Sequence, residues 1–241
     1  MELTGTTVVT VPPLLNPQTI AGLRSDLDAA LADPVSHVVI LLGGDDVFCR
    51  GLDLSAVASA EDARTALERF AGCLQTVRLG GKPVIGLVRG ACVAGGVGLA
   101  AACDGLLATT DATFALTELL FGLVPAIILP YLAQRVSAQK LRWMALSAQT
   151  LTAGEALQLG LADRVCASEN TSKVLRSWAR QLRRVQPSVV GMWKRMTANL
   201  PALPAEEGVQ ITMERLSDPA VRMGFLEFIE SGHLPSTRGD S

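Results

Sequence analysis

Short apolar runs alternate with stretches of helical spacing along the first half of the chain. Continuous apolar, β-branched runs bounded by turn residues predict buried strands over 6–11, 37–42, 83–88 and 105–109. Apolar residues at helical spacing, or a run of small residues, predict helices over 16–32, 61–79 and 96–103. The first of these helices has two candidate capping residues, Asn16 and Thr19. Strands separated by helices are typical of βαβ units, so the sequence predicts an α/β core with a largely parallel sheet.

The pattern changes after about Ala126, where nearly every segment has helical spacing. The predicted helices cover 127–136, 138–147, 153–159, 172–185, 187–200, 205–216 and 219–231. Only the segment 163–166 is expected to be extended. We therefore expect an α/β core over residues 1–186 and a C-terminal helical region over residues 187–241, with no linker between them.

Composition narrows the functional classes. The chain has 241 residues, enough to bury a sizeable core, and 49% of them are hydrophobic. Its formal net charge of −2 argues against a surface that binds nucleic acid. The apolar runs are much shorter than the roughly 18 residues that a membrane span needs. The first residues lack the features of a secretory signal, so we expect a cytoplasmic protein.

Cysteine and histidine usage gives no sign of a disulfide framework or a metal centre. The five cysteines have irregular spacing and form no CxxC pair, which is typical of reduced thiols. Only two histidines are present, so a multi-histidine site is hard to build and we expect no metal. Cys49 and Cys92 flank the turns described next, but no histidine base accompanies either, so both are expected to pack in the core.

Two glycine-containing turns carry the candidate chemistry. One covers residues 48–54 and follows an apolar strand; the other covers 90–98, follows another strand and opens into the small-residue helix. A turn that leads into a helix exposes backbone N–H groups at the positive end of the helix dipole, where a developing oxyanion can be held. Two such turns can each direct one N–H group at a single thioester carbonyl.

These turns and five further motifs, in this order along the chain, resemble the crotonase (enoyl-CoA hydratase/isomerase) superfamily. The matching segments are 48–54, 83–90, 94–99, 103–104, 114–118, 122–125 and 151–156. The resemblance covers most of the chain and implies the crotonase fold, a spiral of βαβ units followed by a helical trimerisation region. It also implies a homotrimer or a hexamer built from two trimers. The apolar stripe of Leu175, Trp178 and Leu182 is expected to pack between elements or between subunits.

One branch of the superfamily matches more closely, the hydratase-like dehydratases of polyketide β-branching cassettes. This likeness rests on residues 117–126 and 129–132 and on the tail from 216 to 232. It implies that a 3-hydroxy-3-methylglutaryl thioester, carried on an acyl carrier protein or on coenzyme A, loses water to give a 3-methylglutaconyl thioester. No cofactor is expected beyond the phosphopantetheine or coenzyme A that carries the substrate.

Two other functions stay open at this point. A Δ3,Δ2-enoyl-thioester isomerase needs a single carboxylate, and a non-catalytic scaffold of the same fold needs none. A decarboxylase of the same superfamily is disfavoured, because residues 55–63 lack the lysine that those enzymes keep after the first turn.

The family positions assign the candidate site residues. Leu52 and Gly95 match the two backbone donors of the oxyanion hole. Glu118 matches the catalytic base and lies in an apolar segment that should raise its pKa. The hydratases of this superfamily carry two catalytic glutamates; the first would fall at Gly98 and is absent, and the second falls at Glu118. Either Glu118 serves both proton transfers, or a water or Asp53 assists the departing hydroxyl, although Asp53 is more simply read as a residue that stabilises the turn.

Substrate contacts are expected from Arg50 and Gly96 in the two turns and from Pro125 beyond Glu118. Four cations are candidates for binding a phosphopantetheine phosphate or a distal substrate carboxylate: Arg50, Lys82, Arg89 and Arg135. The alternative for each of them is a solvated charge at the surface.

Three expectations concern residues outside the two turns. Asp104 should cap backbone groups after the small-residue helix. Lys194 and Arg195 should lie on an exposed helix face. His233 is a candidate for covering the active site, but a surface position near the chain end is the simpler interpretation.

Overall fold

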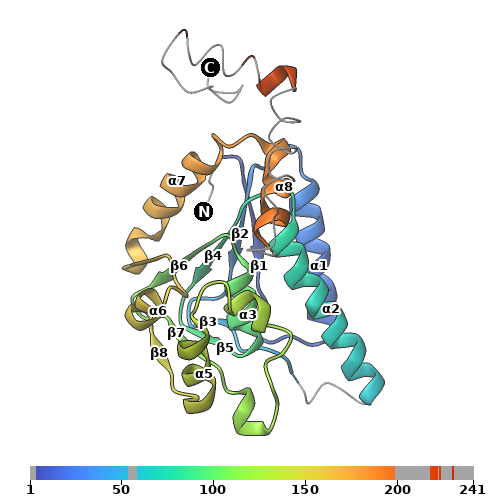
Figure 1. The fold of residues 1–241 in the computed structure, drawn as a ribbon, viewed down its shortest axis with the longest axis vertical. Helices are drawn as coiled ribbons and strands as arrows, with labels where there is room; N and C mark the ends of the chain where they lie inside the picture. The colour runs from blue at the N-terminus through green and yellow to red at the C-terminus, as the bar shows by residue number, and fades with distance from the viewer. Residues whose placement is uncertain (1–3, 54–58, 199–217, 222, 224–229, 231–241) are drawn as a thin grey trace.

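The chain folds as a spiral in which consecutive strands enter two different sheets (Figure 1). The structure is a computed structural model, and it describes residues 4–53, 59–198, 218–221, 223 and 230. The larger sheet has the order β1-β2-β4-β6-β9, and every pairing in it is parallel. Its strands are β1 (Thr6–Thr10), β2 (Val38–Leu42), β4 (Val84–Val88), β6 (Gly105–Thr109) and β9 (Arg164–Cys166).

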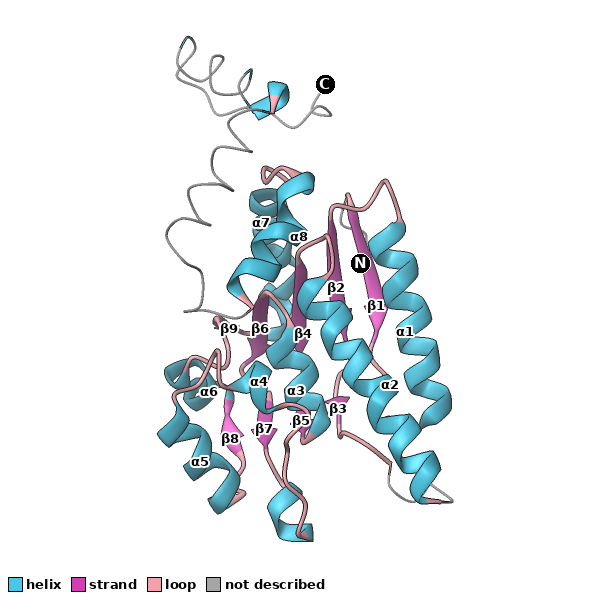
Figure 2. Ribbon diagram, turned by 45° about the vertical axis from the view of Figure 1, so that its right-hand side comes forward, coloured by secondary structure: helices cyan, strands magenta, loops and turns pink. Residues whose placement is uncertain are grey.

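The smaller sheet lies at one end of the larger one (Figure 2). Its order is β3-β5-β7-β8, with β3, β5 and β7 parallel and β8 antiparallel to β7. Its strands are β3 (Val47–Cys49), β5 (Ala91–Val93), β7 (Thr113–Ala115) and β8 (Leu151–Thr152). Each of β2, β4 and β6 is therefore followed directly by a strand of the smaller sheet, and this repetition generates the spiral.

Helices cover the strands on both sides. Their bounds are α1 (Pro17–Ala32), α2 (Ala60–Leu79), α3 (Gly95–Ala102), α4 (Leu129–Leu132), α5 (Ala138–Ser147), α6 (Ala153–Leu159), α7 (Thr171–Leu182) and α8 (Pro187–Thr197), with 3-10 turns η2 (Glu118–Phe121) and η3 (Ser168–Asn170). Asn16 is the cap of α1: its side chain accepts from the N–H groups of Gln18 and Thr19, and the Thr19 hydroxyl accepts from the Asn16 N–H at 2.8 Å.

The two faces of the larger sheet bury different residues of the same strand. In β2, Val39 and Leu41 belong to the main core, which α1, α2 and α3 cover, whereas Val38 and Ile40 belong to a second cluster beneath α7. Figure 1 shows α7 and the α1–α2 pair on opposite sides of the sheet. A strand buried on both faces reads as a continuous apolar run, which is why the sequence predicts these strands well.

The apolar stripe of α7 packs within the chain. Leu175 is fully buried in the second cluster, and Trp178 and Leu182 pack against it. The stripe was expected to pack either between elements of one chain or between subunits. The structure shows the first: it packs between α7 and the larger sheet. Helices predicted over 205–216 and most of 219–231 lie outside the described residues, so the division at residue 187 and the trimerisation region stay predictions.

Two sequence-based assignments in the second half are wrong. The predicted helix over 127–136 is a single turn, α4, and the chain then continues through tight turns to Val136. This path carries Arg135 to the end of α3. The strand β8 was not predicted, because two residues are too few to show a periodicity. In the part of the chain that the structure describes, no helix combines the length and apolarity that crossing a bilayer requires.

Candidate active site

The first candidate donor is the N–H of Leu52, in the turn that follows β3. Backbone hydrogen bonds hold this turn against the start of α1: Leu15 donates to the Gly51 carbonyl at 2.9 Å, and Asp53 donates to the Leu15 carbonyl at 2.8 Å. Gly51 has a φ of +87°, which favours glycine. Within the described residues, the Leu52 N–H has no hydrogen-bond partner.

The second candidate donor is the N–H of Gly95, the first residue of α3. Ala94 precedes it with a φ of 51°, an uncommon conformation for a residue with a side chain, and its N–H donates to the Ala115 carbonyl at 2.9 Å. In the described part of the chain, no side chain caps α3 and the Gly95 N–H has no hydrogen-bond acceptor. It is therefore free to donate at the positive end of the helix dipole.

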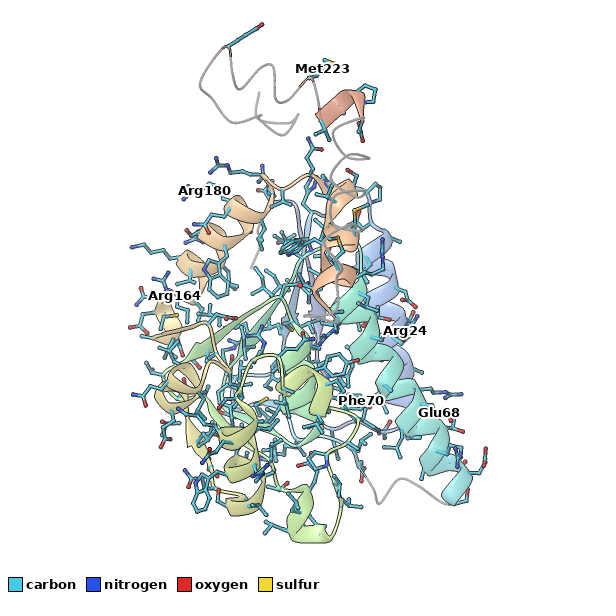
Figure 3. The ribbon with its side chains drawn as sticks, viewed as in Figure 1. Arg24, Glu68, Phe70, Arg164, Arg180 and Met223 are labelled. Atoms are coloured by element: carbon cyan, nitrogen blue, oxygen red, sulfur yellow. The ribbon has the colours of Figure 1, made fainter. Side chains whose placement is uncertain are left out.

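The two turns lie directly against each other. A Cβ atom built on Gly51 would lie 2.9 Å from the Gly95 nitrogen, and one built on Gly96 would lie 2.9 Å from the carbonyl carbon of Cys49. Phe70 of α2 packs against the same place, because a Cβ on Gly95 would lie 3.4 Å from its ring, and Figure 3 shows Phe70 on the inner side of α2. The glycines therefore permit an approach that no other residue allows, and two unpaired N–H groups come close together.

Glu118 follows the same edge of the smaller sheet as the two donors. Leu52 comes after β3, Gly95 after β5 and Glu118 after β7, and these three strands are adjacent and parallel. The carboxyl ends of parallel strands meet at one edge, so the topology gathers the three predicted groups there.

The Glu118 side chain is half-buried at the start of η2. Its Oε2 atom is buried and has no hydrogen-bond partner in the part of the chain that the structure describes. Burial raises the pKa of Glu118 above its ordinary value of 4.5, and the nearby backbone N–H groups of Glu118 and Thr117 oppose this rise only in part. A carboxylate with a raised pKa and an unused oxygen suits proton transfer at carbon.

Ile128 fills the space beside Gly98, the position that the resemblance assigns to the first glutamate of the hydratases. A Cβ atom built on Gly98 would overlap the Cγ2 atom of Ile128 and lie 2.5 Å from its Cβ, and Ile128 itself is 3% exposed. A longer side chain at this position would have to displace Ile128. The packing of Ile128 against α3 therefore leaves no room for a glutamate side chain at position 98.

Asp53 lies on the other side of Leu52 from Gly51. Together with Leu15 and Leu67 it lines a small cavity of about 30 Å³ between the first turns of α1 and α2. Its backbone N–H donates to the Leu15 carbonyl, a bond that does not depend on the side chain. A role for its carboxylate in the departure of the hydroxyl stays a prediction.

The three predicted substrate contacts lie close to these groups in the chain. Arg50 is exposed in the first turn, and its N–H donates to the Pro13 carbonyl at 2.8 Å. Gly96 is the second residue of α3 and approaches β3 too closely to carry a side chain. Pro125 lies between η2 and α4, and its carbonyl accepts from the Leu129 N–H at 3.1 Å. Their contacts with substrate stay predictions.

The other three candidate cations contact groups of the protein itself. Lys82 donates to the carbonyls of Ala30 and Asp33 at the end of α1. Arg89 pairs with Asp45. The third, Arg135, donates to carbonyl groups at the end of α3 and is 11% exposed, so its guanidinium is held mainly by the protein.

Cys49 and Cys92 pack in the core, as predicted. Cys49 and Cys92 are fully buried, and burial raises the pKa of Cys49 to about 11 and that of Cys92 well above its ordinary value. Among the described residues, no cluster of three or more His, Cys, Asp or Glu side chains is placed to hold a metal ion. His233 lies outside the described residues.

Lys194 was wrongly predicted to lie on an exposed face. It is 5% exposed, and its ammonium group pairs with Asp104 at 2.7 Å. Asp104 also accepts from the Val84 N–H at 2.7 Å, so its predicted capping role is confirmed. Burial raises the pKa of Asp104, although the Lys194 charge opposes this rise. The available signal was the spacing: Lys194 is four residues after the apolar Val190 and so shares its buried face.

Comparisons with known proteins agree with this geometry. The model of the enoyl-CoA hydratase/isomerase family matches residues 13–235. The bacillaene synthase dehydratase PksH of Bacillus subtilis is 30% identical over 205 residues, which cover 82% of this chain and 78% of that protein. The carnitinyl-CoA dehydratase of Proteus mirabilis is 33% identical over 186 residues, which cover 74% of this chain and 70% of that protein.

Solved structures extend the likeness to nearly the whole chain. The structure of PksH, described as a putative polyketide biosynthesis enoyl-CoA hydratase, has a TM-score of 0.73 at 27% identity and covers 98% of this chain and 97% of its own. AtuE of Pseudomonas aeruginosa has a TM-score of 0.86 at 27% identity, with 98% of this chain and 96% of that chain covered.

Proposed function

This chain belongs to the enoyl-CoA hydratase/isomerase family, and on that premise we propose that it removes water from a 3-hydroxyacyl thioester of the 3-hydroxy-3-methylglutaryl type. The acyl group is carried by the phosphopantetheine arm of an acyl carrier protein or by coenzyme A, and the reaction serves β-branching of a polyketide. Its curated relatives are named hydratases and dehydratases, so the chain is a lyase of the crotonase fold. The likeness to PksH supports the narrower choice of acyl group and carrier.

In the proposed reaction, the N–H groups of Leu52 and Gly95 donate to the thioester carbonyl oxygen. This oxygen gains negative charge when the α-carbon loses its proton, so the donors stabilise the enolate more than the ground state. Each backbone donor of this kind contributes about 10²–10³ to the rate. The dipole of α3 acts in the same direction at Gly95.

Glu118 moves the proton. It removes the proton from the α-carbon, the enolate re-forms the carbonyl and expels the β-hydroxyl, and Glu118 returns its proton to that hydroxyl as water leaves. The protein ends with the protonation it had at the start. A tertiary β-carbon eases the departure of the hydroxyl. Asp53, or a water, is the alternative proton donor for this last step.

The observation that carries the proposal is the buried Oε2 atom of Glu118, which has no hydrogen-bond partner among the described residues. It lies at the sheet edge where two backbone N–H groups also have no partner in the described part of the chain. Burying a carboxylate oxygen without a hydrogen bond destabilises a fold, so a scaffold protein would have no reason to keep it. This weighs against the non-catalytic reading of the chain.

A direct test follows the mass of the substrate. The purified protein is incubated with 3-hydroxy-3-methylglutaryl carrier protein and, separately, with the coenzyme A thioester, and each mixture is analysed by mass spectrometry. We expect the loss of one water from at least one of them, and a reaction slower by about 10²–10⁴ with the Glu118→Gln variant. Inert hydroxyacyl thioesters with both carriers would overturn the proposal.

One observation favours a second candidate, a Δ3,Δ2-enoyl-thioester isomerase. Of the two positions where the hydratases carry glutamates, position 98 is glycine with Ile128 beside it, so only position 118 has a carboxylate. An isomerase needs only one carboxylate to carry a proton between C2 and C4. A 3-enoyl thioester whose double bond moves while the hydroxyacyl thioesters stay intact would establish this alternative. A cytoplasmic location, a homotrimer or hexamer, and independence of any further cofactor also stay predictions.

A further inference from the structure

The helix that supplies the Gly95 donor is buried along its whole length but has little intrinsic helical stability. α3 has eight residues, three of them glycine, and no side chain caps its first turn. Glycine weakens a helix, and the uncapped Gly95 N–H must stay unpaired if it is to bind a thioester oxygen. Near that end, Gly96 packs against Cys49 of β3 and Gly95 packs against the ring of Phe70.

The opposite end of α3 is held by a buried guanidinium from a distant segment. The Nε of Arg135 donates to the Ala101 carbonyl at 3.0 Å, and its Nη2 donates to the Cys103 carbonyl at 2.6 Å. Its Nη1 donates to the Leu161 carbonyl at 3.2 Å and to Asp163 at 2.9 Å. One side chain thus joins the last turn of α3 to the segment that leads into β9.

A buried ammonium group holds the next residue. The Nζ of Lys194 donates to Asp104 at 2.7 Å and to the carbonyls of Val77 at 2.9 Å and Lys82 at 3.0 Å, so all three of its protons are used. The same oxygen of Asp104 accepts from the Val84 N–H at 2.7 Å. Lys194 therefore ties the end of α3 to α2, β4 and α8.

We propose that Arg135 and Lys194 are positioning residues for the oxyanion hole. They act through α3, whose eight residues span about 12 Å, and fix its axial position and rotation so that the Gly95 N–H stays against the Leu52 turn. A cation at the carboxyl end of a helix also stabilises it by interaction with the helix dipole. The inference rests on the proposed function, because it assigns these residues a role in binding the thioester oxygen.

The surroundings favour variants that still fold. Arg135 and Lys194 line a polar cavity of about 360 Å³ together with Arg78, Gln134 and Thr197. Water that enters this cavity can bind the carbonyls that a shortened side chain leaves unpaired. Truncation is therefore expected to displace α3 by a small distance rather than to unfold the protein.

The test measures the bound carbonyl directly. The probe is a 3-methylglutaryl pantetheine thioester with a ¹³C-labelled carbonyl, which lacks the β-hydroxyl and cannot react. Isotope-edited infrared spectroscopy reports how far the carbonyl stretch moves to lower frequency on binding, and this shift measures the strength of the donated hydrogen bonds. Turnover of the hydroxyacyl thioester gives kcat and KM in parallel.

We expect Arg135→Met and Lys194→Met each to lose at least half of the wild-type frequency shift. Their kcat should fall by about 10- to 100-fold, while KM changes by less than about threefold, because the interaction lost is made mainly in the transition state. Arg135→Lys should recover part of both the shift and kcat. If one methionine variant does not fold, the lysine variant and the other position give the same comparison.

Lys82→Met is the matched control. Lys82 caps the carboxyl end of α1 through the carbonyls of Ala30 and Asp33, much as Arg135 caps α3, but the N-terminus of α1 has its own cap at Asn16 and supplies no donor. This variant should melt at a lower temperature and keep the wild-type shift and kcat.

Two outcomes separate the inference from the proposed function. If Arg135→Met keeps the wild-type activity and the wild-type frequency shift, the positioning role alone is overturned. The same holds if Lys82→Met loses as much activity and shift as Arg135→Met does. A wild-type protein that neither shifts the carbonyl band nor turns over a thioester would overturn the proposed function and this inference with it.

Discussion

Adding one methyl group at Gly98 should destabilise this protein, although the same change stabilises most helices. Replacing glycine by alanine inside a helix ordinarily raises the free energy of unfolding by about 0.5–1 kcal/mol. At Gly98, however, the new Cβ would overlap the Cγ2 atom of the buried Ile128. The sign of the effect therefore tests whether Ile128 fills the position of the missing glutamate.

The magnitude follows from two opposing contributions. Forcing an extra methyl group into a packed core costs about 1–3 kcal/mol, which exceeds the gain in helix propensity. We expect Gly98→Ala to lower the free energy of unfolding by about 1–2 kcal/mol. Ile128→Ala alone should lower it by about 2–5 kcal/mol, because it leaves a cavity. In the double variant the added methyl occupies part of that cavity, so the loss should be smaller than the sum by about 1–3 kcal/mol.

Urea unfolding at one fixed protein concentration measures all three variants. Gly22→Ala is the matched control: Gly22 lies on α1 with nothing within 4 Å of a built Cβ, so this change should stabilise the fold by about 0.5–1 kcal/mol. A Gly98→Ala variant that is stabilised as much as Gly22→Ala, or a double variant that loses the full sum, would refute the steric argument.

Further predictions concern Glu118, Gly95 and assembly. Glu118→Gln should lower kcat by about 10²–10⁴ in the mass-spectrometric assay, and unchanged turnover would remove Glu118 from the mechanism. The same variant should be more stable than wild type at neutral pH in thermal melts. Burial raises the pKa of Glu118 in the folded state, so its ionised form destabilises the fold above that pKa and the penalty disappears as the pH falls through it. The pH profile of kcat/KM should rise through a midpoint above the ordinary value of 4.5, and a midpoint at or below that value would contradict the desolvation argument. Gly95→Pro should lose at least about 10²–10³ in kcat, because it removes the N–H and its ring also crowds the turn against Gly51 and Phe70, and circular dichroism with a thermal melt should separate the two causes. Light scattering at micromolar concentration should show a trimer or hexamer, and a monomer would contradict the resemblance-based expectation.

Much of the site could be predicted because its residues are conspicuous in the chain. Gly51 and Gly95 follow apolar runs, and a glycine after a buried strand marks a turn that brings backbone N–H groups to the surface. Glu118 is the one acidic residue between Asp111 and Glu155, and a lone carboxylate in an apolar segment is expected to be desolvated. The resemblance to the crotonase superfamily joined these separate features into one site, and the comparisons confirm the family and the fold.

The missed residues share a physical property: their partners are far away in the sequence. Lys194 pairs with Asp104, and Arg135 reaches back to Ala101 and Cys103. A long cationic side chain reads as solvated in a local pattern, because the pattern does not contain the carbonyls and the carboxylate that bind it. Only the tertiary structure shows that these charges are buried.

The sequence by itself determined the strands of the larger sheet, the long helices and the order of the two turns, because burial on one or both faces leaves a local period in the hydrophobic residues. Other features leave no periodic pattern in the sequence and appear only in the tertiary structure. Strands β3, β5, β7 and β8 have only two or three residues and exist because neighbouring strands pair with them. Likewise, the space beside Gly98 belongs to Ile128, a residue 30 positions later, because close packing between α3 and α4 leaves room for one side chain there and not for two.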